Sequence, residues 1–152
     1  MSNIKLRNAL EKDKKILFKW FNEEEDLKYK LKTKSKISFT EHSLWFSNIL
    51  SDSKSFLWII ELKKKSVGQI RLDYIKFKYY EIDIHIDKMF RGMNIGKQAL
   101  MQAEKKLLKE CVIISKVKKN NLASLKFFKT SNFVMLRQNQ EMWILKKRIK
   151  IN

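Results

Sequence analysis

The 152-residue sequence predicts a single α/β domain, residues 1–152, and two patterns in the middle of the chain carry that prediction. Three consecutive runs, residues 55–62, 67–76 and 79–87, are rich in β-branched and aromatic residues, which is typical of strands. The stretch FRGMNIGKQAL, residues 90–100, follows them and leads into a helical pattern. A strand, a glycine turn, a helix and another strand therefore form the predicted centre of an α/β unit.

The N-terminal third predicts one strand and two helices. Residues 3–9 alternate weakly, as in a short strand, and from Glu11 apolar residues recur at helical spacing. A polar, irregular piece is expected from 22 to 37. A second helix is expected over 38–50, because Ser38 and Glu41 can form a capping box at its start.

The remaining elements follow from periodicity. The run 79–87 alternates strictly, with Tyr80, Ile82, Ile84 and Ile86 on one side and Glu81, Asp83, His85 and Asp87 on the other. The helix after the glycine stretch is expected to extend to about Glu110. It is followed by a β-branched strand over 111–118, a helix over 122–130, and a closing hairpin of 133–139 with 141–149.

The formal net charge of +18 raises the question of nucleic-acid binding. However, 29 of the 34 basic residues are lysines, and they are spread through every segment. Arginine, which is best suited to forked contacts with phosphates and base edges, is scarce. The sequence therefore favours a Lys-rich surface that attracts acidic small molecules over a nucleic-acid interface.

Nothing in the sequence indicates an oxidising compartment or a membrane. The single cysteine, Cys111, cannot form an internal disulfide and opens an apolar run, so burial is expected. The N-terminal residues lack the apolar core of a signal peptide, and no segment has the apolar length of a bilayer span. A cytoplasmic protein is expected, and no metal site is predicted.

The two glycines of the stretch, Gly92 and Gly96, have three residues between them. A glycine turn between a strand and a helix brings backbone N–H groups close to an anion at the helix N-terminus. The spacing differs from the dinucleotide fingerprint, which needs three glycines. It also differs from a Walker loop, because Gln98 and not Ser or Thr follows Lys97.

The stretch resembles the pyrophosphate loop of the Gcn5-related N-acetyltransferases, abbreviated GNAT: Arg or Gln, two residues, Gly, one residue, then Gly or Ala. Arg91, Asn94 and Gly96 take these positions, and Asn is the non-glycine residue that best tolerates left-handed angles. The later segment KNNLASLKFFKTSNF resembles the family's second motif through Asn121, Ala123, Ser124, Phe128 and Phe133. This resemblance implies a mixed, mostly antiparallel sheet of six to seven strands with about four helices, splayed between the fourth and fifth strands.

The resemblance also implies acetyl-CoA as the cofactor, with CoA as the product. The pantetheine arm would enter the gap between strands 80–87 and 111–118 as an added strand would. Backbone N–H groups from Arg91 to Lys97 would hold the diphosphate. The implied cofactor-binding residues are Ile84, His85, Ile86, Arg91, Gly92, Met93, Asn94, Ile95, Gly96, Lys97, Asn121 and Phe128.

In such an enzyme an acceptor ammonium must lose a proton before its nitrogen can attack. Glu81 is the first candidate for the base, because the family often carries an acidic residue there; the alternative is an exposed Glu81 paired with a lysine. His85 and His42 are the next candidates. Phe128 stands where most members have a tyrosine that protonates the leaving sulfur, so the usual acid is missing.

The N-terminal third resembles acetyltransferases that modify nucleotide-linked deoxyamino sugars of the pseudaminic-acid type. His42, Trp45, Arg71 and Glu81 are the expected substrate-binding residues, since aromatic faces suit a sugar or uracil ring and Arg71 suits a diphosphate. Core packing is the alternative for Trp20 and Trp45. Two other functions stay open, a protein N-terminal or lysine acetyltransferase and a non-catalytic basic binding protein, as does a homodimer.

Overall fold

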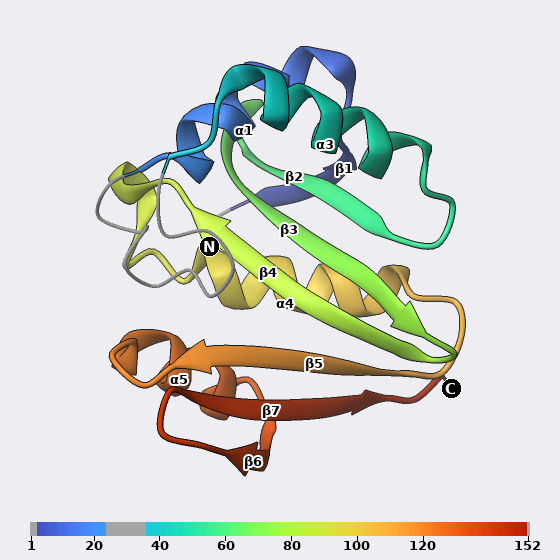
Figure 1. Ribbon diagram of the computed structural model, residues 1–152, viewed down its shortest axis with the longest axis vertical. Coiled ribbons are helices and arrows are strands. Elements are labelled where there is room, and N and C mark those ends of the chain that lie inside the picture. Colours follow the sequence, from blue (N-terminus) through green and yellow to red (C-terminus); the bar gives the residue numbers. More distant parts are fainter. Residues whose placement is uncertain (1–2, 24–35, 152) are drawn as a thin grey trace.

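The computed structural model describes residues 3–23 and 36–151, so most of the segment 22–37 that the sequence predicts to be irregular lies outside the described residues. Figure 1 shows one mixed sheet with helices on both faces. The strands are β1 Ile4–Asn8, β2 Phe56–Leu62, β3 Lys65–Lys76, β4 Tyr79–Ile86, β5 Cys111–Lys118, β6 Val134–Gln138 and β7 Met142–Ile149. The helices are α1 Lys14–Phe21, α3 Phe39–Ser51, α4 Ile95–Lys106 and α5 Leu122–Thr130, with short 3-10 turns η1 Glu11–Asp13 and η2 Lys88–Phe90.

These elements confirm the predicted α/β class and the order of strands and helices. Ser38 caps α3, as the capping-box pattern indicates, because its side chain accepts a hydrogen bond from the backbone N–H of Glu41 at 3.1 Å. The predicted end of α4 at about Glu110 is wrong. The backbone of Leu107 is already extended, which turns its side chain into the core, while Leu108 is 87% exposed.

The sheet has the strand order β1-β2-β3-β4-β5-β7-β6. Every neighbouring pair is antiparallel except β4 and β5, which are parallel. β4 and β5 pair only from Tyr79–Val112 to Glu81–Ile114, although β4 continues to Ile86 and β5 to Lys118. The two strands diverge beyond Glu81, as Figure 1 shows, which confirms the expected splay.

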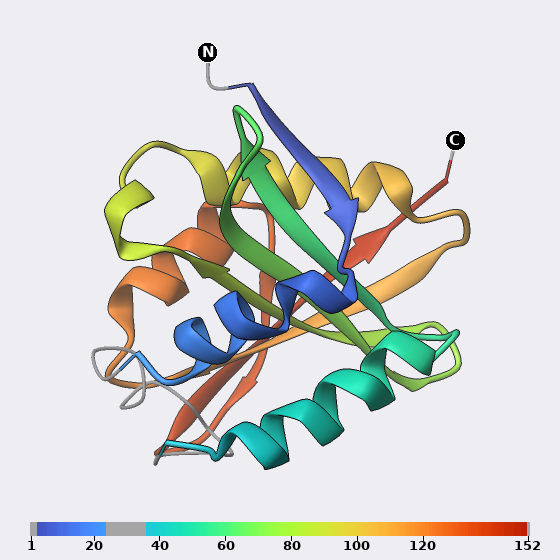
Figure 2. The same ribbon diagram turned by 90° about the horizontal axis from the view of Figure 1, so that it is seen from above.

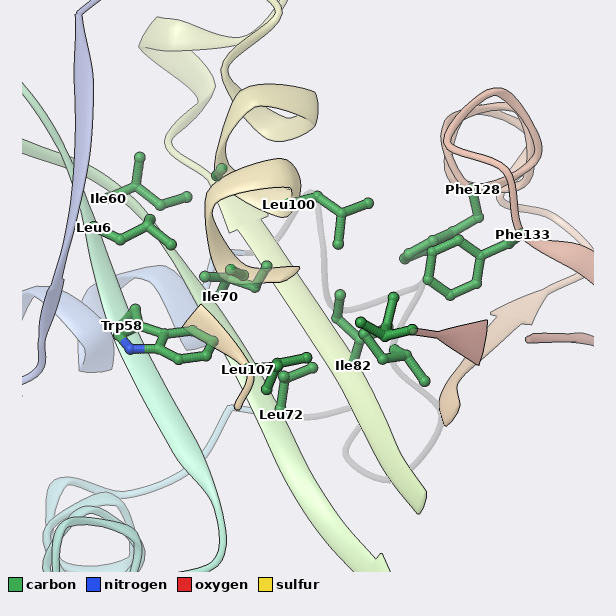
Figure 3. Close-up of a cluster of buried hydrophobic side chains, with 14 of the residues drawn as sticks. Leu6, Trp58, Ile60, Ile70, Leu72, Ile82, Leu100, Leu107, Phe128 and Phe133 are labelled. Atoms are coloured by element: carbon green, nitrogen blue, oxygen red, sulfur yellow. The ribbon is translucent and has the colours of Figure 1, made fainter. Parts of the chain in front are cut away.

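Two apolar clusters lie on opposite faces of the sheet. α1 and α3 cover one face, where Trp20 and Phe46 pack on Leu57 and Ile59 of β2; Figure 2 shows both helices in front of the strands. The larger cluster lies under α4 and α5 and includes the residues labelled in Figure 3, among them Trp58, Leu100 and Phe133.

The strict alternation of β4 decides which of its side chains enter the core. Tyr80, Ile82, Ile84 and Ile86 pack into or against the α4/α5 cluster. The intervening residues therefore project from the face that α1 and α3 partly cover. Within the described residues, each helix is too short or too polar to span a bilayer.

Candidate functional site

The divergence of β4 and β5 leaves one edge of β4, beyond Glu81, without a neighbouring strand among the described residues. On its other edge β4 is paired with β3 along its length, from Lys76–Tyr79 to Gly68–Ile86. A strand edge that lacks a partner offers a row of backbone N–H and C=O groups to an extended ligand. Ile84, His85 and Ile86 all lie in this open part of β4. The carbonyl oxygen of Ile86 already accepts a hydrogen bond from Nε of Arg91 at 2.9 Å.

The N-terminus of α4 follows from β4 through η2 and the glycine stretch. Gly92 and Asn94 both have left-handed backbone angles, with φ of 81° and 62°, and asparagine tolerates this conformation best among the non-glycine residues. The first backbone hydrogen bond of α4 runs from the N–H of Gln98 to the carbonyl oxygen of Asn94, at 3.4 Å. The N–H groups of Ile95, Gly96 and Lys97 belong to the first turn, where no intrahelical acceptor exists. This terminus suits an anion such as a diphosphate.

The space around the two glycines differs. A Cβ atom on Gly92 would meet no atom within 4 Å in the part of the chain that the structure describes, so the loop is open on that side. A Cβ atom on Gly96 would lie 3.1 Å from Cε2 of Phe127 on α5 and 3.9 Å from Cγ1 of Ile86. Packing between α4 and α5 is thus one reason for glycine at position 96. Arg91, Gly92, Met93 and Asn94 are exposed, Ile95 is buried, and Gly96 and Lys97 are partly exposed.

Asn121 and Phe128, the expected contributions of the second motif, have structural roles. Asn121 caps α5, because its Oδ1 accepts a hydrogen bond from the Ser124 N–H at 3.1 Å. Phe128 is 4% exposed and lies 5.0 Å, between ring centroids, from both Phe127 and Phe133. Asn132 adopts a left-handed φ of 71° just after α5.

Glu81 lies at the last β4–β5 pair, where the two strands begin to part. Its Oε1 is 3.0 Å from Nζ of Lys116 on β5, and the side chains are 22% and 35% exposed. The pairing of Glu81 with a lysine, which the sequence analysis gave as the alternative to a catalytic role, is therefore present. Lys116 was not singled out from the sequence, because its proximity to Glu81 depends on the parallel register of the two strands.

Carboxylates gather around Glu81 on the same face of β3 and β4. Asp73 lies opposite Glu81, and Arg71 opposite Asp83. Arg71 is held by both aspartates, with its Nε 3.0 Å from Asp73 and its Nη1 4.0 Å from Asp83. The Nε2 of Gln69 also donates a hydrogen bond to Asp83 at 2.7 Å. The strict alternation of residues 79–87 could have indicated that Asp83 lies on the same face as Glu81. The position of Asp73 opposite Glu81, however, depends on the β3–β4 register and could not be predicted from one segment.

Aromatic rings cover the other side of Arg71. Its guanidinium carbon lies 5.3 Å from the ring centroid of Trp45 and 5.9 Å from that of Phe21, which is a cation–π arrangement. Trp45 and Arg71, both expected from the sequence to bind the acceptor, are thus in contact. However, two carboxylates and two rings already contact this guanidinium, so it is a poor candidate for binding a diphosphate.

His42 is 0% exposed and lies among aromatic rings of α1 and α3. Its Nε2 is 2.9 Å from the carbonyl oxygen of Lys14. Burial lowers its pKa, which the hydrogen bond to that carbonyl partly opposes. In this conformation His42 has no surface with which to touch an acceptor, and it stabilises the contact between α1 and α3.

His85 lies at the open end of β4, with its ring 5.7 Å from that of Trp20. The indole Nε1 of Trp20 donates a hydrogen bond to Asp87 at 3.1 Å. Burial would raise the pKa of Asp87, but the backbone N–H of Met89 and the Trp20 indole outweigh it, and the pKa lies below its usual value. These contacts hold the end of β4 against α1.

A hollow of about 120 Å³ lies at the paired ends of β4 and β5, on the side away from the gap, and extends toward β7. Its floor is apolar, with Val112 and Ile114 of β5, and Lys146 and Arg148 of β7 stand at its side. Val112 and Lys146 both neighbour Ile114 in the sheet, which pairs with Glu81. The acidic group around Glu81 and this cationic hollow therefore adjoin.

Comparison with known proteins agrees with this geometry. The sequence profile of the family described as Acetyltransferase (GNAT) family matches residues 15–133, which is most of the chain. None of the curated proteins matches the chain at the sequence level.

Solved structures show the same fold. A domain from Methanocaldococcus jannaschii superposes with a TM-score of 0.84 at 23% identity, covering 97% of this chain and 99% of that one. Spermidine N-acetyltransferase from Vibrio cholerae, in complex with CoA and spermine, gives 0.84 at 16% identity, covering 96% and 95%. An N-acetyltransferase from Staphylococcus aureus gives 0.79 at 16% identity, covering 98% and 100%.

Proposed function

The chain belongs to the acetyltransferase (GNAT) family and is an acetyl-CoA-dependent N-acetyltransferase, and from that premise we propose that its acceptor is a small, positively charged primary amine. The observation that carries this proposal is the group of three carboxylates, Asp73, Glu81 and Asp83, beside the gap between β4 and β5. In a chain of net charge +18, a local excess of carboxylates at this point is selective for cations.

The residues of the gap fit the cofactor. The first-turn N–H groups of α4, at Ile95, Gly96 and Lys97, suit its diphosphate, and the open Gly92 loop lets that group approach the backbone. The edge of β4 around Ile84, where β5 has diverged, suits the amide groups of its pantetheine arm. Acetyl-CoA, when bound, supplies an acetyl group activated as a thioester.

Glu81 takes the role of general base in this proposal. It lies where the β4–β5 gap begins, and it is partly exposed, so an acceptor can reach it. A carboxylate there can accept a proton from the acceptor ammonium, either directly or through one water molecule. The backbone N–H groups of the open part of β4 can stabilise negative charge on a carbonyl oxygen. Phe128 cannot donate a proton and is buried, so it has no part in acid catalysis.

The acceptor class follows from charge. Asp73 and Asp83 neutralise Arg71, and Lys116 engages Glu81, which leaves three carboxylates facing two cations on this face of the sheet. The side chain of Asp83 is 50% exposed, the most open of the three. A diamine or polyamine could place one amino group at Glu81 and a second cationic group at Asp83. Spermidine N-acetyltransferase is among the proteins that share the fold.

A nucleotide-linked amino sugar is the second candidate acceptor. The cationic hollow favours it, because Lys146 and Arg148 could bind a diphosphate while the amino group lies near Glu81. The aromatic rings of Trp45 and Phe21 would suit a sugar or uracil ring, but the guanidinium of Arg71 lies against both of them. The acidic group beside the gap gives the cationic amine the stronger support.

A thiol-release assay over three acceptor classes tests the proposal: spermidine, UDP-linked amino sugars, and peptides with a free lysine or N-terminus. Turnover with spermidine is expected, and Asp83→Asn should raise its KM about tenfold, as the loss of a charge-assisted contact does. Exposed Glu110 provides the matched control, since Glu110→Gln removes a charge outside the site. Turnover only with UDP-sugars, with a KM that Lys146→Gln raises, would replace this acceptor with the second candidate. Turnover only with peptides would reject both.

A separate measurement tests cofactor binding. Acetyl-CoA should raise the melting temperature, because a ligand that binds only the folded state stabilises it. The absence of any shift at saturating acetyl-CoA would favour the non-catalytic binding protein that the sequence left open.

A further inference from the structure

Lys116 brings a primary amine of the protein itself to the start of the β4–β5 gap. It lies two residues after Ile114, which is the last β5 residue paired with β4. Its side chain therefore starts from β5 and reaches toward β4, where its Nζ lies 3.0 Å from Oε1 of Glu81. The proposed base is thus already in contact with an amine that could become an acceptor.

We propose that Lys116 is a self-acetylation site, modified by the enzyme's own acetyl-CoA when no small amine is present. The inference rests on the proposed role of Glu81. A proton passes from the Lys116 ammonium to the Glu81 carboxylate, and the nitrogen then forms a bond to the acetyl carbon. The carbon–sulfur bond of the thioester breaks, the nitrogen gives up its second proton, and CoA leaves as a thiolate that takes up this proton. The products are an amide on Nζ and the CoA thiol.

The ion pair does not prevent this reaction. Both side chains are partly exposed, and ion pairs of this kind contribute little to stability, so the lysine can exchange between Glu81 and the gap. Acetylation removes the positive charge of Lys116, and the neutral amide no longer competes with an acceptor ammonium for Glu81. The modification should therefore lower the KM for a cationic acceptor.

A second lysine supplies a matched control. Lys147 of β7 also forms an ion pair with a glutamate, Nζ to Oε1 of Glu104 at 2.6 Å, and the two side chains are 20% and 18% exposed. Glu104 belongs to α4 and Lys147 to β7, so this pair lies outside the β4–β5 gap. General reactivity of lysine with acetyl-CoA affects both residues, whereas self-acetylation affects only Lys116.

The first experiment incubates the purified protein with acetyl-CoA alone and follows the acetyl occupancy of each lysine by peptide mass spectrometry. Occupancy of Lys116 should rise well above that of Lys147. Glu81→Gln should slow acetylation of Lys116 about 100-fold, as loss of a general base does, while Glu104→Gln leaves it unchanged. Equal occupancy at the two lysines, or no effect of Glu81→Gln, would overturn the proposal.

The second experiment needs no turnover. An isotopically labelled N-hydroxysuccinimide acetate ester modifies accessible lysines chemically, with and without CoA. CoA should protect Lys116 and leave the labelling of Lys147 unchanged, because only Lys116 lies at the gap. If CoA does not protect Lys116, this lysine lies outside the acetyl-binding region, and the proposal is overturned.

The two proposals can fail separately. Turnover of a small amine without acetylation of Lys116 would reject self-acetylation and leave the enzyme function intact. If neither reaction occurs while CoA still raises the melting temperature, the proposed function fails as well.

Discussion

A Cβ atom on Gly68 of β3 would lie 2.4 Å from the carbonyl oxygen of His85 on β4, closer than any real contact allows. Two further atoms, Cδ1 of Ile86 and Cδ1 of Ile60, would lie within 3.2 Å of it. Gly68 faces Ile86 at the last β3–β4 pair, on the edge of β4 opposite the gap. The glycine therefore lets β3 hold the end of β4 in the position that forms the gap.

Gly68→Ala should destabilise the fold by about 2–3 kcal/mol, because a backbone carbonyl cannot move aside as a flexible side chain can. It should also weaken CoA binding, since the end of β4 must shift. Urea unfolding and calorimetric titration with CoA measure the two effects. For stability alone, Gly92→Ala is the control: its Cβ meets no atom of the described residues within 4 Å, and it carries only the cost of a left-handed backbone, about 1 kcal/mol. Equal losses of stability in both variants would show that the contact with His85 is unimportant.

The turn between β2 and β3 should be open to stabilisation. Lys63 and Lys64 form a two-residue loop between paired Leu62 and Lys65, and both have positive φ, of 51° and 68°. Such a turn favours Asn-Gly. Replacing the two lysines with Asn and Gly should raise the free energy of unfolding by about 1–2 kcal/mol. Lys64→Ala keeps a non-glycine residue at the positive φ, so it should not raise the free energy of unfolding. An equal increase in this variant would point to the reduced charge as the cause.

The buried carboxylate of Asp13 should make the free energy of unfolding decrease as the pH is lowered. It is 3% exposed, and its carboxylate accepts two hydrogen bonds from Arg7, at 2.7 and 2.8 Å, and one from the Leu10 N–H at 2.7 Å. Burial would raise its pKa, but Arg7 and the Leu10 N–H outweigh burial, and the pKa is lowered. A lowered folded-state pKa gives stability that is present above the unfolded value and is lost as pH falls through the folded value.

Asp13→Asn should therefore cost about 2 kcal/mol at pH 7, and the difference from the unsubstituted protein should shrink below about pH 4. Chemical unfolding between pH 7 and pH 3 provides the measurement. A difference that stays constant over this range would mean that the ionised form of Asp13 contributes nothing.

Gly96→Val should disturb the packing of α4 against α5. Its Cβ would be 3.1 Å from the Phe127 ring, so the ring or the helix must move, at a cost of about 1–3 kcal/mol. CoA affinity should fall with it, because the first turn of α4 shifts. Phe127→Ala removes the obstructing ring, so the loss caused by Gly96→Val should be smaller in that background. A loss of affinity that is the same in both backgrounds would instead indicate a direct block of the diphosphate.

Glu81→Gln should lower turnover at neutral pH by about 100-fold, since no base remains to take the acceptor proton. Turnover should recover as pH rises, because more of the acceptor is then already deprotonated. Stopped thiol-release assays from pH 6.5 to about pH 10 give the profile. Glu104→Gln serves as the control, and an unchanged profile for Glu81→Gln would exclude the base role.

Local patterns predicted most of the elements. The alternation of Tyr80 to Asp87 identified both faces of β4, and the β-branched run gave β5 its observed bounds, Cys111–Lys118. The end of α4 was missed because Leu107 and Leu108 continue a helical apolar pattern although only Leu107 enters the core. The close approach of two backbones at Gly68 was not predicted, although a lone glycine inside a strand is a sign of such an approach.

The candidate site was predicted less completely, because its contacts join distant segments. The residue type of Asn94 indicated only that it tolerates the left-handed angle that it adopts. Nothing in the local sequence indicates that Lys116 lies 3.0 Å from Glu81, or that Arg71 lies between two aspartates and two aromatic rings. The expectation that Arg71 is available for a diphosphate arose because its neighbours on β4 and α3 could not be known.

The sequence by itself determined the fold class, because strand alternation, the glycine turn and the cap residues act over a few positions of the chain. Its resemblance to the GNAT motifs indicated the family and the cofactor. Only the tertiary structure decided the charge around the gap and which residues share it. That charge depends on the register of β3 with β4 and of β4 with β5, which brings together side chains far apart in the sequence. Register is fixed by packing of the whole sheet, and single segments carry no record of it.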